Sequence, residues 1–151
     1  LPSEISAAFA LEQLKKLKKN IKIRIKNFEK IYKFFKNYSK YFNLPTQHPD
    51  VKTGWLAYPI IIKEKSKIKR REMQIYLEKK GIQTRTIFTG NILRQPIMKN
   101  KNFKKVKNAS INSDNIMKNG ILIGCHQGLN EKEINYVFKC VKDFLKKNKL
   151  G

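Results

Sequence analysis

The side chains best suited to binding a ligand are concentrated in one segment, residues 81–96 (GIQTRTIFTGNILRQP). Two of the five arginines of the chain, Arg85 and Arg94, lie there within ten residues of each other, on either side of Asn91, and Gln95 follows. Guanidinium and amide groups on a loop that follows a strand can bind phosphorylated or polyhydroxyl ligands. A plain turn, in which Arg85 pairs with a nearby carboxylate, explains the same pattern. Both interpretations stay open at this point.

Residues that could act as bases, nucleophiles or metal ligands are few. His48 precedes a proline in a loop and His126 follows a strand; either could be a base, although an isolated loop histidine is more often a surface residue. Cys125 and Cys140 are too few and too far apart for a disulfide framework or a metal knuckle, so we expect buried thiols. The sequence has no glycine-rich phosphate loop, HExxH motif or nucleophile elbow. We therefore assign neither a catalytic residue nor a metal site to this chain.

The length and composition indicate one domain with a strong positive charge. A chain of 151 residues can build one core, and 34 basic against 11 acidic residues give a net charge of +23. Such a charge points to nucleic acid or an anionic membrane surface. However, most of the excess is lysine, which is spread along the whole chain and has A/T-rich codons, as the abundant asparagine and isoleucine also have. We therefore do not expect nucleic-acid binding as the main function, and a free-standing basic nucleic-acid-binding domain is kept as an alternative.

The elements that position these side chains begin with a long helical stretch over residues 2–42. Its apolar residues recur mostly every three or four positions, which predicts one helix or two helices joined end to end, with any joint expected at Asn20. An apolar stripe of this length exceeds what a small domain covers by itself. We expect it to pack along a larger body or in a dimer interface. Peripheral membrane attachment through this lysine-rich helix is a weaker option, and no apolar run is long enough to span a membrane.

A β-α-β unit follows. Residues 55–62 predict a strand, with Pro59 at an edge or a bulge. Ser66 predicts the cap of a helix over residues 67–80, which ends at Gly81, and residues 82–87 alternate like a second strand.

The C-terminal part predicts a further loop, a strand and two helices. Residues 88–101 match no period and form a loop, and Ser113 predicts the cap of a short helix that stops at Gly120. A brief strand over residues 121–125 comes next. Asn130 then opens the last helix with the spacing of a capping box. The chain as a whole predicts an α+β fold.

Several segments resemble one enzyme family along nearly the whole chain. They are SEISAA (3–8), WLAYPI (55–60), TRTIFTGNILRQP (84–96) and IGCHQGL (123–129). Together they resemble the C-terminal part of the DegT/DnrJ/StrS family of vitamin B6-dependent enzymes that modify nucleotide sugars. The phrase over residues 84–96 is similar to the 3-dehydratase branch, most of all to the CDP-4-keto-6-deoxyglucose 3-dehydratases of lipopolysaccharide synthesis, rather than to the aminotransferases.

The resemblance implies a fold and an activity. The fold is the small C-terminal domain of a fold-type-I, aspartate aminotransferase-like enzyme, with residues 1–43 linking to a missing large cofactor domain and residues 44–151 forming the small domain. The substrate is a nucleotide-linked 4-keto-6-deoxy sugar. The cofactor is pyridoxal or pyridoxamine phosphate, bound mainly by the missing domain, and an iron-sulfur cluster is possible upstream. A fragment of a nucleotide-sugar aminotransferase is the near alternative.

The resemblance also implies where function lies within the chain. Arg85 and Arg94 are expected to make charge-assisted contacts to the substrate or the cofactor region, and Asn91 and Gln95 to bind sugar hydroxyls. The catalytic base belongs to the missing domain, so this fragment alone is expected to be inactive. The full-length protein is expected to be a cytoplasmic homodimer that works with a reductase and binds neither membrane nor nucleic acid.

Overall fold

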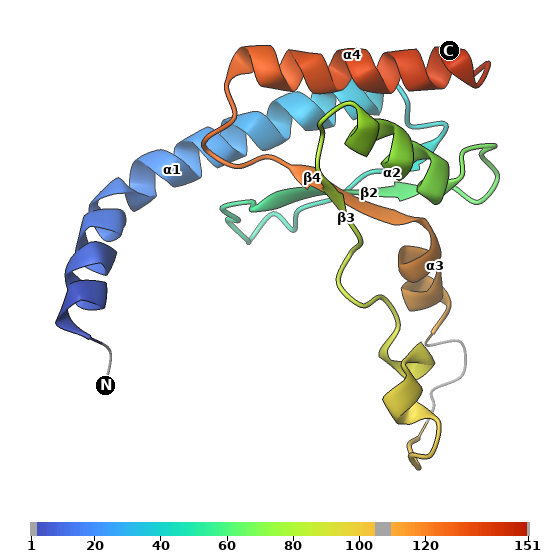
Figure 1. Ribbon diagram of the computed structural model, residues 1–151, viewed down its shortest axis with the longest axis horizontal. Helices are drawn as coiled ribbons and strands as arrows, with labels where there is room; N and C mark the ends of the chain where they lie inside the picture. Colours follow the sequence, from blue (N-terminus) through green and yellow to red (C-terminus); the bar gives the residue numbers. More distant parts are fainter. Residues whose placement is uncertain (1–2, 105–109, 151) are drawn as a thin grey trace.

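The computed structural model describes residues 3–104 and 110–150. In chain order the elements are α1 (Glu4–Lys36), β1 (Phe42–Asn43), β2 (Ala57–Ile62), α2 (Arg70–Lys79), β3 (Thr84–Arg85), the 3-10 helices η1 (Ile92–Arg94) and η2 (Pro96–Met98), α3 (Ile111–Asn119), β4 (Gly120–Gly124) and α4 (Glu131–Lys147). Helices α1, α2 and α4 lie over one face of a small sheet, whereas α3 and the 3-10 helices extend away from one end of it (Figure 1). Within the described residues, no helix is long and apolar enough to cross a membrane.

The sheet has the strand order β1-β2-β4-β3, and every pair in it is antiparallel. Strands β2 and β3 therefore run parallel to each other, with β4 inserted between them. The predicted β-α-β unit exists in this split form, although the second strand is only two residues long. Because β2 and β3 end at the same edge of the sheet, the segments that follow them leave from that edge, and β4 begins there.

Pro59 lies in the part of β2 that is paired with β4 on one side but has no strand paired with it on the other side. It lies opposite Leu122 of β4, while β1 pairs only with Ile61 and Ile62 at the far end of the strand. A proline has no N–H to donate, so it fits where one side of the strand lacks a neighbour. Strand β2 lies between β1 and β4, so the predicted edge strand is wrong, and the predicted bulge is also absent because the register with β4 runs through Pro59. Pro59 is accommodated because β1 pairs only with the far end of β2.

Helix α1 is continuous from Glu4 to Lys36, so the single helix is the correct alternative and the joint at Asn20 is not formed. The helix also ends earlier than predicted, because Phe42 pairs with Ile62 as part of β1. Only its C-terminal half enters the core. There Asn27 is buried and its Nδ2 donates hydrogen bonds to the carbonyls of His126 and Leu129, which fixes α1 to the loop after β4.

The N-terminal half of α1 carries the apolar stripe into solvent. Ile5, Phe9 and Leu14 are each more than 60% exposed, and Leu17 is 44% exposed. The sequence expectation that a domain of this size cannot cover the stripe is confirmed. This half of the helix extends beyond the sheet and the other helices (Figure 1).

The core lies between the sheet and the three helices. Alternate residues of β2, namely Tyr58, Ile60 and Ile62, are at most 1% exposed and point toward the helices. Two rings of α1 stack on aromatic residues of this segment. The ring centroid of Phe35 lies 5.7 Å from that of Tyr58, and the ring centroid of Phe28 lies 3.9 Å from that of Trp55, just before β2. Burial of such aromatic surface dominates the stability of a small core.

Helix α2 begins differently from the sequence prediction but ends as predicted. It begins after Lys69 with no side-chain cap, and Ser66 instead accepts a hydrogen bond from the Ile68 N–H, so the prediction that Ser66 caps this helix is wrong. Its end matches the prediction. Gly81 has φ of +73°, and the N–H groups of Gly81 and Ile82 bond to carbonyls of the last turn, as in a Schellman motif.

Helices α3 and α4 frame β4. The short helix α3 begins after Ser110, so the prediction that Ser113 caps it is wrong, although the helix does end just before Gly120. The capping box at α4 is confirmed: the Asn130 side chain accepts from the Glu133 N–H at 3.1 Å, and Glu133 accepts from the Asn130 N–H at 2.7 Å. The face predicted to be apolar on α4 packs against the core.

Candidate functional site

The segment singled out by the sequence leaves the sheet at the end of β3 and forms a compact loop against α3. Arg85 is the last residue of β3, and its side chain is exposed. Among residues 3–104 and 110–150 it forms no ion pair, so the carboxylate partner of the plain-turn interpretation is not observed. The nearby Glu78 instead binds the N–H and hydroxyl of Thr84. Arg85 therefore presents its guanidinium to solvent at the rim of the loop.

Asn91 has a structural position inside the loop. Its side chain is only 3% exposed. Its Oδ1 accepts from the Leu93 N–H at 3.0 Å, which caps η1, and its Nδ2 donates to Asp114 Oδ1 at 2.8 Å. Buried amides in proteins are normally satisfied in this way. Most of the hydrogen-bonding capacity of Asn91 is thus used within the protein.

Arg94 is joined to the same carboxylate. Its Nε donates to Asp114 Oδ1 at 3.0 Å and its terminal Nη2 donates to Asp114 Oδ2 at 2.8 Å, a bidentate pair. The hydrogen bonds from Arg94 and Asn91 lower the pKa of Asp114 to about 2. One edge of the guanidinium is therefore occupied by Asp114, and only the remaining donors are available to a ligand.

Gly90 lets the loop approach α3 closely. Its φ of +72° is in the left-handed region, and a Cβ built on it would lie 2.4 Å from the Cβ of Met117. No side chain fits at that distance. The glycine is therefore required both by the backbone conformation and by contact with the helix that carries Asp114.

Gln95 closes the loop from the other side. Its Nε2 donates to the carbonyl of Thr89 at 3.0 Å. Beside it is a hollow of about 260 Å³ lined by Arg70, Thr86, Ile87, Phe88, Thr89, Gly90, Gln95 and Met117. The structure thus brings the four predicted residues onto one loop. Arg85 and Arg94 are exposed, Gln95 is partly buried and Asn91 is buried, and Asn91 and Arg94 are bonded to Asp114 of α3.

The residue that organises this arrangement was missed from the sequence. Asp114 is distant from residues 85–95 in the chain and sits within a helix, so its place opposite Arg94 depends on tertiary structure. The one sequence signal for Asp114 is that aspartate is rare in this chain, which has only three. An acidic residue facing a loop with two arginines is a natural ion-pair partner.

The remaining candidate residues do not form a reactive cluster. His48 Nδ1 accepts from the Asp50 N–H, and His126 Nδ1 accepts from the Gly128 N–H at 3.1 Å, both at the surface. The prediction of buried thiols is confirmed for Cys125 and Cys140, and burial raises the pKa of Cys125 to about 11. Within the part of the chain that the structure describes, no group of acidic, histidine or cysteine side chains could hold a metal ion.

The fold and the loop together define a class of protein. The small antiparallel sheet under a long entry helix matches part of the aminotransferase fold. A Psychrobacter cryohalolentis aminotransferase, at only 12% identity, superimposes with a TM-score of 0.80 over 93% of this chain and 38% of that one. The match to the DegT/DnrJ/EryC1/StrS aminotransferase family runs over residues 3–142. The chain belongs to this family.

Individual relatives are more similar in sequence. A GDP-4-keto-6-deoxy-D-mannose 3-dehydratase of Escherichia coli is 33% identical over 93% of this chain and 36% of its own length. The lipopolysaccharide biosynthesis protein RfbH of Salmonella typhimurium is 29% identical over 94% of this chain and 32% of its own length. The structure of the E. coli dehydratase with bound hydrated pyridoxal phosphate (PLP) has a TM-score of 0.81 and 32% identity over 92% of this chain and 35% of that chain. This chain spans about a third of the length of the curated relatives it matches.

The hollow beside the loop does not by itself contain the partners that PLP needs. The hollow beside the loop has one cationic side chain, Arg70, and its lining contains neither an aspartate to face the pyridine nitrogen nor a lysine or histidine base. A group with a ring nitrogen, a phosphate and a reactive carbonyl needs such partners.

Proposed function

We propose that this chain is the small domain of a PLP- or pyridoxamine phosphate-dependent nucleotide-sugar 3-dehydratase that acts on a 4-keto-6-deoxyhexose in lipopolysaccharide sugar synthesis. Residues 1–43 link to the large cofactor domain and residues 44–151 form the small domain. The loop over residues 85–95 closes on the sugar end of the substrate. The chain is inactive alone, because the cofactor and the base belong to the large domain.

One observation carries the proposal: sequence identity separates the dehydratases from the aminotransferases of the same fold. Structures of the GDP-4-keto-6-deoxymannose 3-dehydratase are 32–33% identical to this chain, whereas solved aminotransferases with TM-scores of 0.72–0.80 are 12–17% identical. Shared architecture therefore does not explain the higher identity. An amino-transferring enzyme is the nearest alternative.

The contacts within the loop divide its residues into two roles. Arg85 is exposed without an ion-pair partner among the described residues, and Gln95 lines the hollow beside the loop. We therefore assign them direct contacts to the substrate, through charge-assisted and neutral hydrogen bonds respectively. Asn91 and Arg94 are held by Asp114 and fix the shape of the loop. A rigid loop orients the sugar so that the C3–O bond is aligned for elimination.

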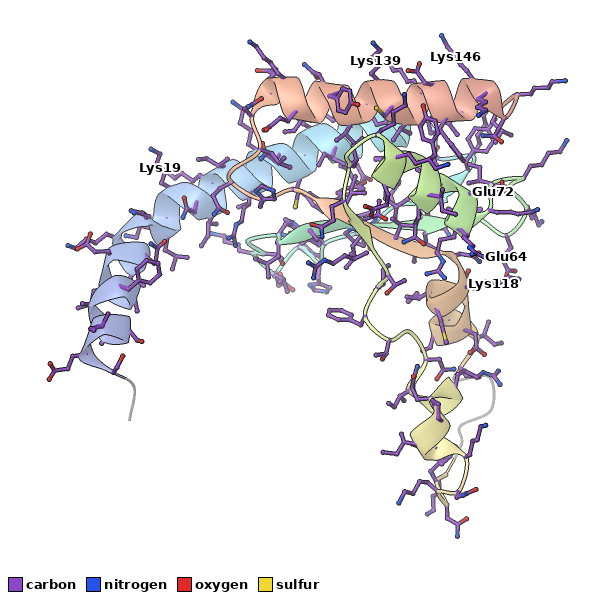
Figure 2. The ribbon with its side chains drawn as sticks, viewed as in Figure 1. Lys19, Glu64, Glu72, Lys118, Lys139 and Lys146 are labelled. Carbon is purple, nitrogen blue, oxygen red and sulfur yellow. The ribbon has the colours of Figure 1, made fainter. Side chains whose placement is uncertain are left out.

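The partners follow from the same assignment. The cofactor is PLP or pyridoxamine phosphate, the full-length protein is a cytoplasmic homodimer, and a reductase takes up the product. An iron-sulfur cluster would lie outside this chain, since the two buried cysteines are not placed to hold one. The nucleic-acid alternative gains no specific support: labelled lysines lie on α1, α3 and α4 in different parts of the molecule (Figure 2).

The coding sequence upstream of Leu1 tests the proposal directly. A reading frame that continues into the family's cofactor domain, with a histidine at the position of the usual Schiff-base lysine, is the expected result. A lysine at that position would make the protein an aminotransferase. A stop codon or an unrelated sequence would contradict the proposal and leave a basic binding domain as the better account.

The role of Arg85 is tested in the full-length enzyme. Arg85→Ala removes an exposed guanidinium without disturbing the core, so kcat/KM for the nucleotide sugar is expected to fall at least about tenfold while the melting temperature stays unchanged. Lys146→Ala, an exposed cation on α4, is the matched control and keeps full activity. Unchanged kinetics for Arg85→Ala would remove this residue from the site.

A further inference from the structure

A second hollow, of about 550 Å³, lies between the turn that joins α2 to β3, the end of β4 and the first two turns of α4. It is larger than the hollow of about 260 Å³ beside the loop, and the described residues that line the two hollows do not overlap. Gly81 and Gln83, which line the larger hollow, precede β3, whereas the loop follows it. Sites for small molecules typically have volumes of about 300–1,000 Å³. The larger hollow is therefore a separate candidate for a small-molecule site.

Most of the lining of this hollow is apolar. Its aliphatic side chains are buried or half-buried and belong to Ile82, Ile123, Leu129 and Val137. The hydroxyl of Tyr136 donates to the carbonyl of Lys80 at 3.1 Å, which holds the Tyr136 ring at the wall. A Cβ built on Gly81 would meet nothing within 4 Å. The space next to these apolar groups is thus open, and an apolar ligand would gain free energy by covering them.

Two hydrogen-bond donors accompany the apolar lining. His126 Nδ1 accepts from the Gly128 N–H at 3.1 Å, so the neutral imidazole carries its proton on Nε2. This Nε2 lies on the side of Gly124, which lines the hollow, because a Cβ built on Gly124 would be 3.8 Å from it. Lys132 is exposed and forms no ion pair among residues 3–104 and 110–150. An ammonium group and an imidazole N–H are therefore available to a ligand.

The acidic side of the hollow is already used by the protein. Glu133 is the one carboxylate among the described residues that line it. Its Oε2 accepts from the Asn130 N–H at 2.7 Å in the capping box of α4. A cationic ligand would have to compete with the helix cap for this carboxylate, whereas an anionic ligand finds the unpaired ammonium of Lys132. The charges at the hollow thus favour a negative head group.

We propose that this hollow binds a small amphiphilic carboxylate, that is, the anion of a carboxylic acid with a bulky apolar body. The body covers the aliphatic side chains, and the carboxylate accepts hydrogen bonds from Lys132 and His126. The apolar body supplies most of the affinity, while the charge-assisted hydrogen bonds select the head group. The site lies outside the candidate loop, so its occupation does not require the proposed dehydratase activity.

A titration of the 151-residue chain, followed by amide chemical shifts, tests this site. The probe is 4-phenylbutyrate. Two comparisons, 4-phenylbutanol and 4-phenylbutylamine, keep the same body with a neutral or a cationic head group, and acetate has the head group alone. We expect 4-phenylbutyrate to shift the amides of Gln83, Gly124 and Lys132, but not those of residues 86–98. It should bind at least about tenfold more tightly than each of the three comparisons.

Variants of α4 separate a contact at the hollow from the general positive charge of the chain. Lys132→Ala removes the cation at the hollow. Lys139→Ala is the matched control, because Figure 2 shows Lys139 on the outer side of the same helix, pointing away from the sheet. We expect 4-phenylbutyrate to bind at least about fivefold more weakly to Lys132→Ala and within about twofold of the original affinity to Lys139→Ala. Val137→Trp fills the hollow and should abolish saturable binding.

The outcomes decide both the place and the head group. Absence of a saturable shift, shifts spread over lysine-bearing surfaces of several elements, or equal weakening by Lys132→Ala and Lys139→Ala would overturn the site. Equal affinity for 4-phenylbutanol would overturn the assignment to a carboxylate. If Val137→Trp does not fold, the position of the shifts and the comparison of the two lysine variants still decide the proposal.

Discussion

Asp114 and Arg94 form a bidentate ion pair that joins the candidate substrate loop to α3, with N–O distances of 3.0 and 2.8 Å. The same carboxylate accepts from Asn91, so one acidic residue fixes two of the four residues that the sequence singled out.

We expect Asp114→Asn to loosen this loop while the core, which Asp114 does not enter, stays intact. Limited proteolysis should then cut within residues 86–104 at least about tenfold faster, with an unchanged melting temperature. Asp50→Asn, which changes an exposed carboxylate outside this loop, is the control. Equal proteolysis of both variants would show that the pair does not order the loop.

The order of the loop should also depend on pH. The pKa of Asp114 is lowered in the folded protein from 3.8 to about 2. A carboxyl group with a depressed pKa contributes its stabilisation fully above its unfolded pKa and loses it as the pH falls toward the folded value. Loop order is therefore expected to be constant above about pH 4 and to decline between about pH 4 and 2. Amide chemical shifts of residues 91–95 would follow this transition in the original chain, and Asp114→Asn should abolish it.

Gly90 and Gly81 have nearly the same backbone conformation but different surroundings. Both have φ above +70°, yet a Cβ on Gly81 would meet nothing within 4 Å, whereas one on Gly90 would collide with Met117. Gly81→Ala should cost only the backbone strain, about 1 kcal/mol of unfolding free energy. Gly90→Ala adds the collision, so its cost should exceed that of Gly81→Ala by at least about 1 kcal/mol. Equal losses in denaturant titrations would mean that the loop does not rest on α3.

The hydroxyl of Tyr58 is buried without a hydrogen-bond partner among the residues that the structure describes. Burial raises the pKa of this phenol well above its ordinary value. An unsatisfied buried hydroxyl costs free energy, so Tyr58→Phe should leave the unfolding free energy unchanged or raise it by up to about 1 kcal/mol. Tyr58→Ala, which removes the ring from the core, should cost about 3–5 kcal/mol. A clear loss of stability in Tyr58→Phe would reveal a partner for the hydroxyl.

The capping box of α4 offers a test of local stability. Asn130→Ala removes the acceptor for the Glu133 N–H, which should cost about 0.5–2 kcal/mol of unfolding free energy. Asn135, exposed within the same helix, gives the matched control. Asn135→Ala should be neutral or slightly stabilising, because alanine favours a helix interior. A loss for Asn135→Ala as large as that for Asn130→Ala would show that the cap contributes little.

The sequence by itself determined the structural features that depend only on residues close together in the chain. The capping box at Asn130 and the left-handed cap at Gly81 depend on residues a few positions apart, and both form as predicted. The loop around Asn91 was also recognisable, because its residue types and order resemble those of one family. The apolar stripe of α1 predicted correctly that its N-terminal half would not be covered by this domain.

Tertiary structure decided what depends on contacts between distant segments. Phe42 leaves the helix because it pairs with Ile62 in the sheet, and no helical periodicity can show that. The insertion of β4 between β2 and β3 makes these two strands parallel, so the segments that follow them leave from the same end of the sheet. Asp114 lies opposite Arg94 only because α3 folds back along the loop, which Gly90 permits. Side-chain pairing of this kind is set by packing in space, whereas propensity and spacing act only along the chain.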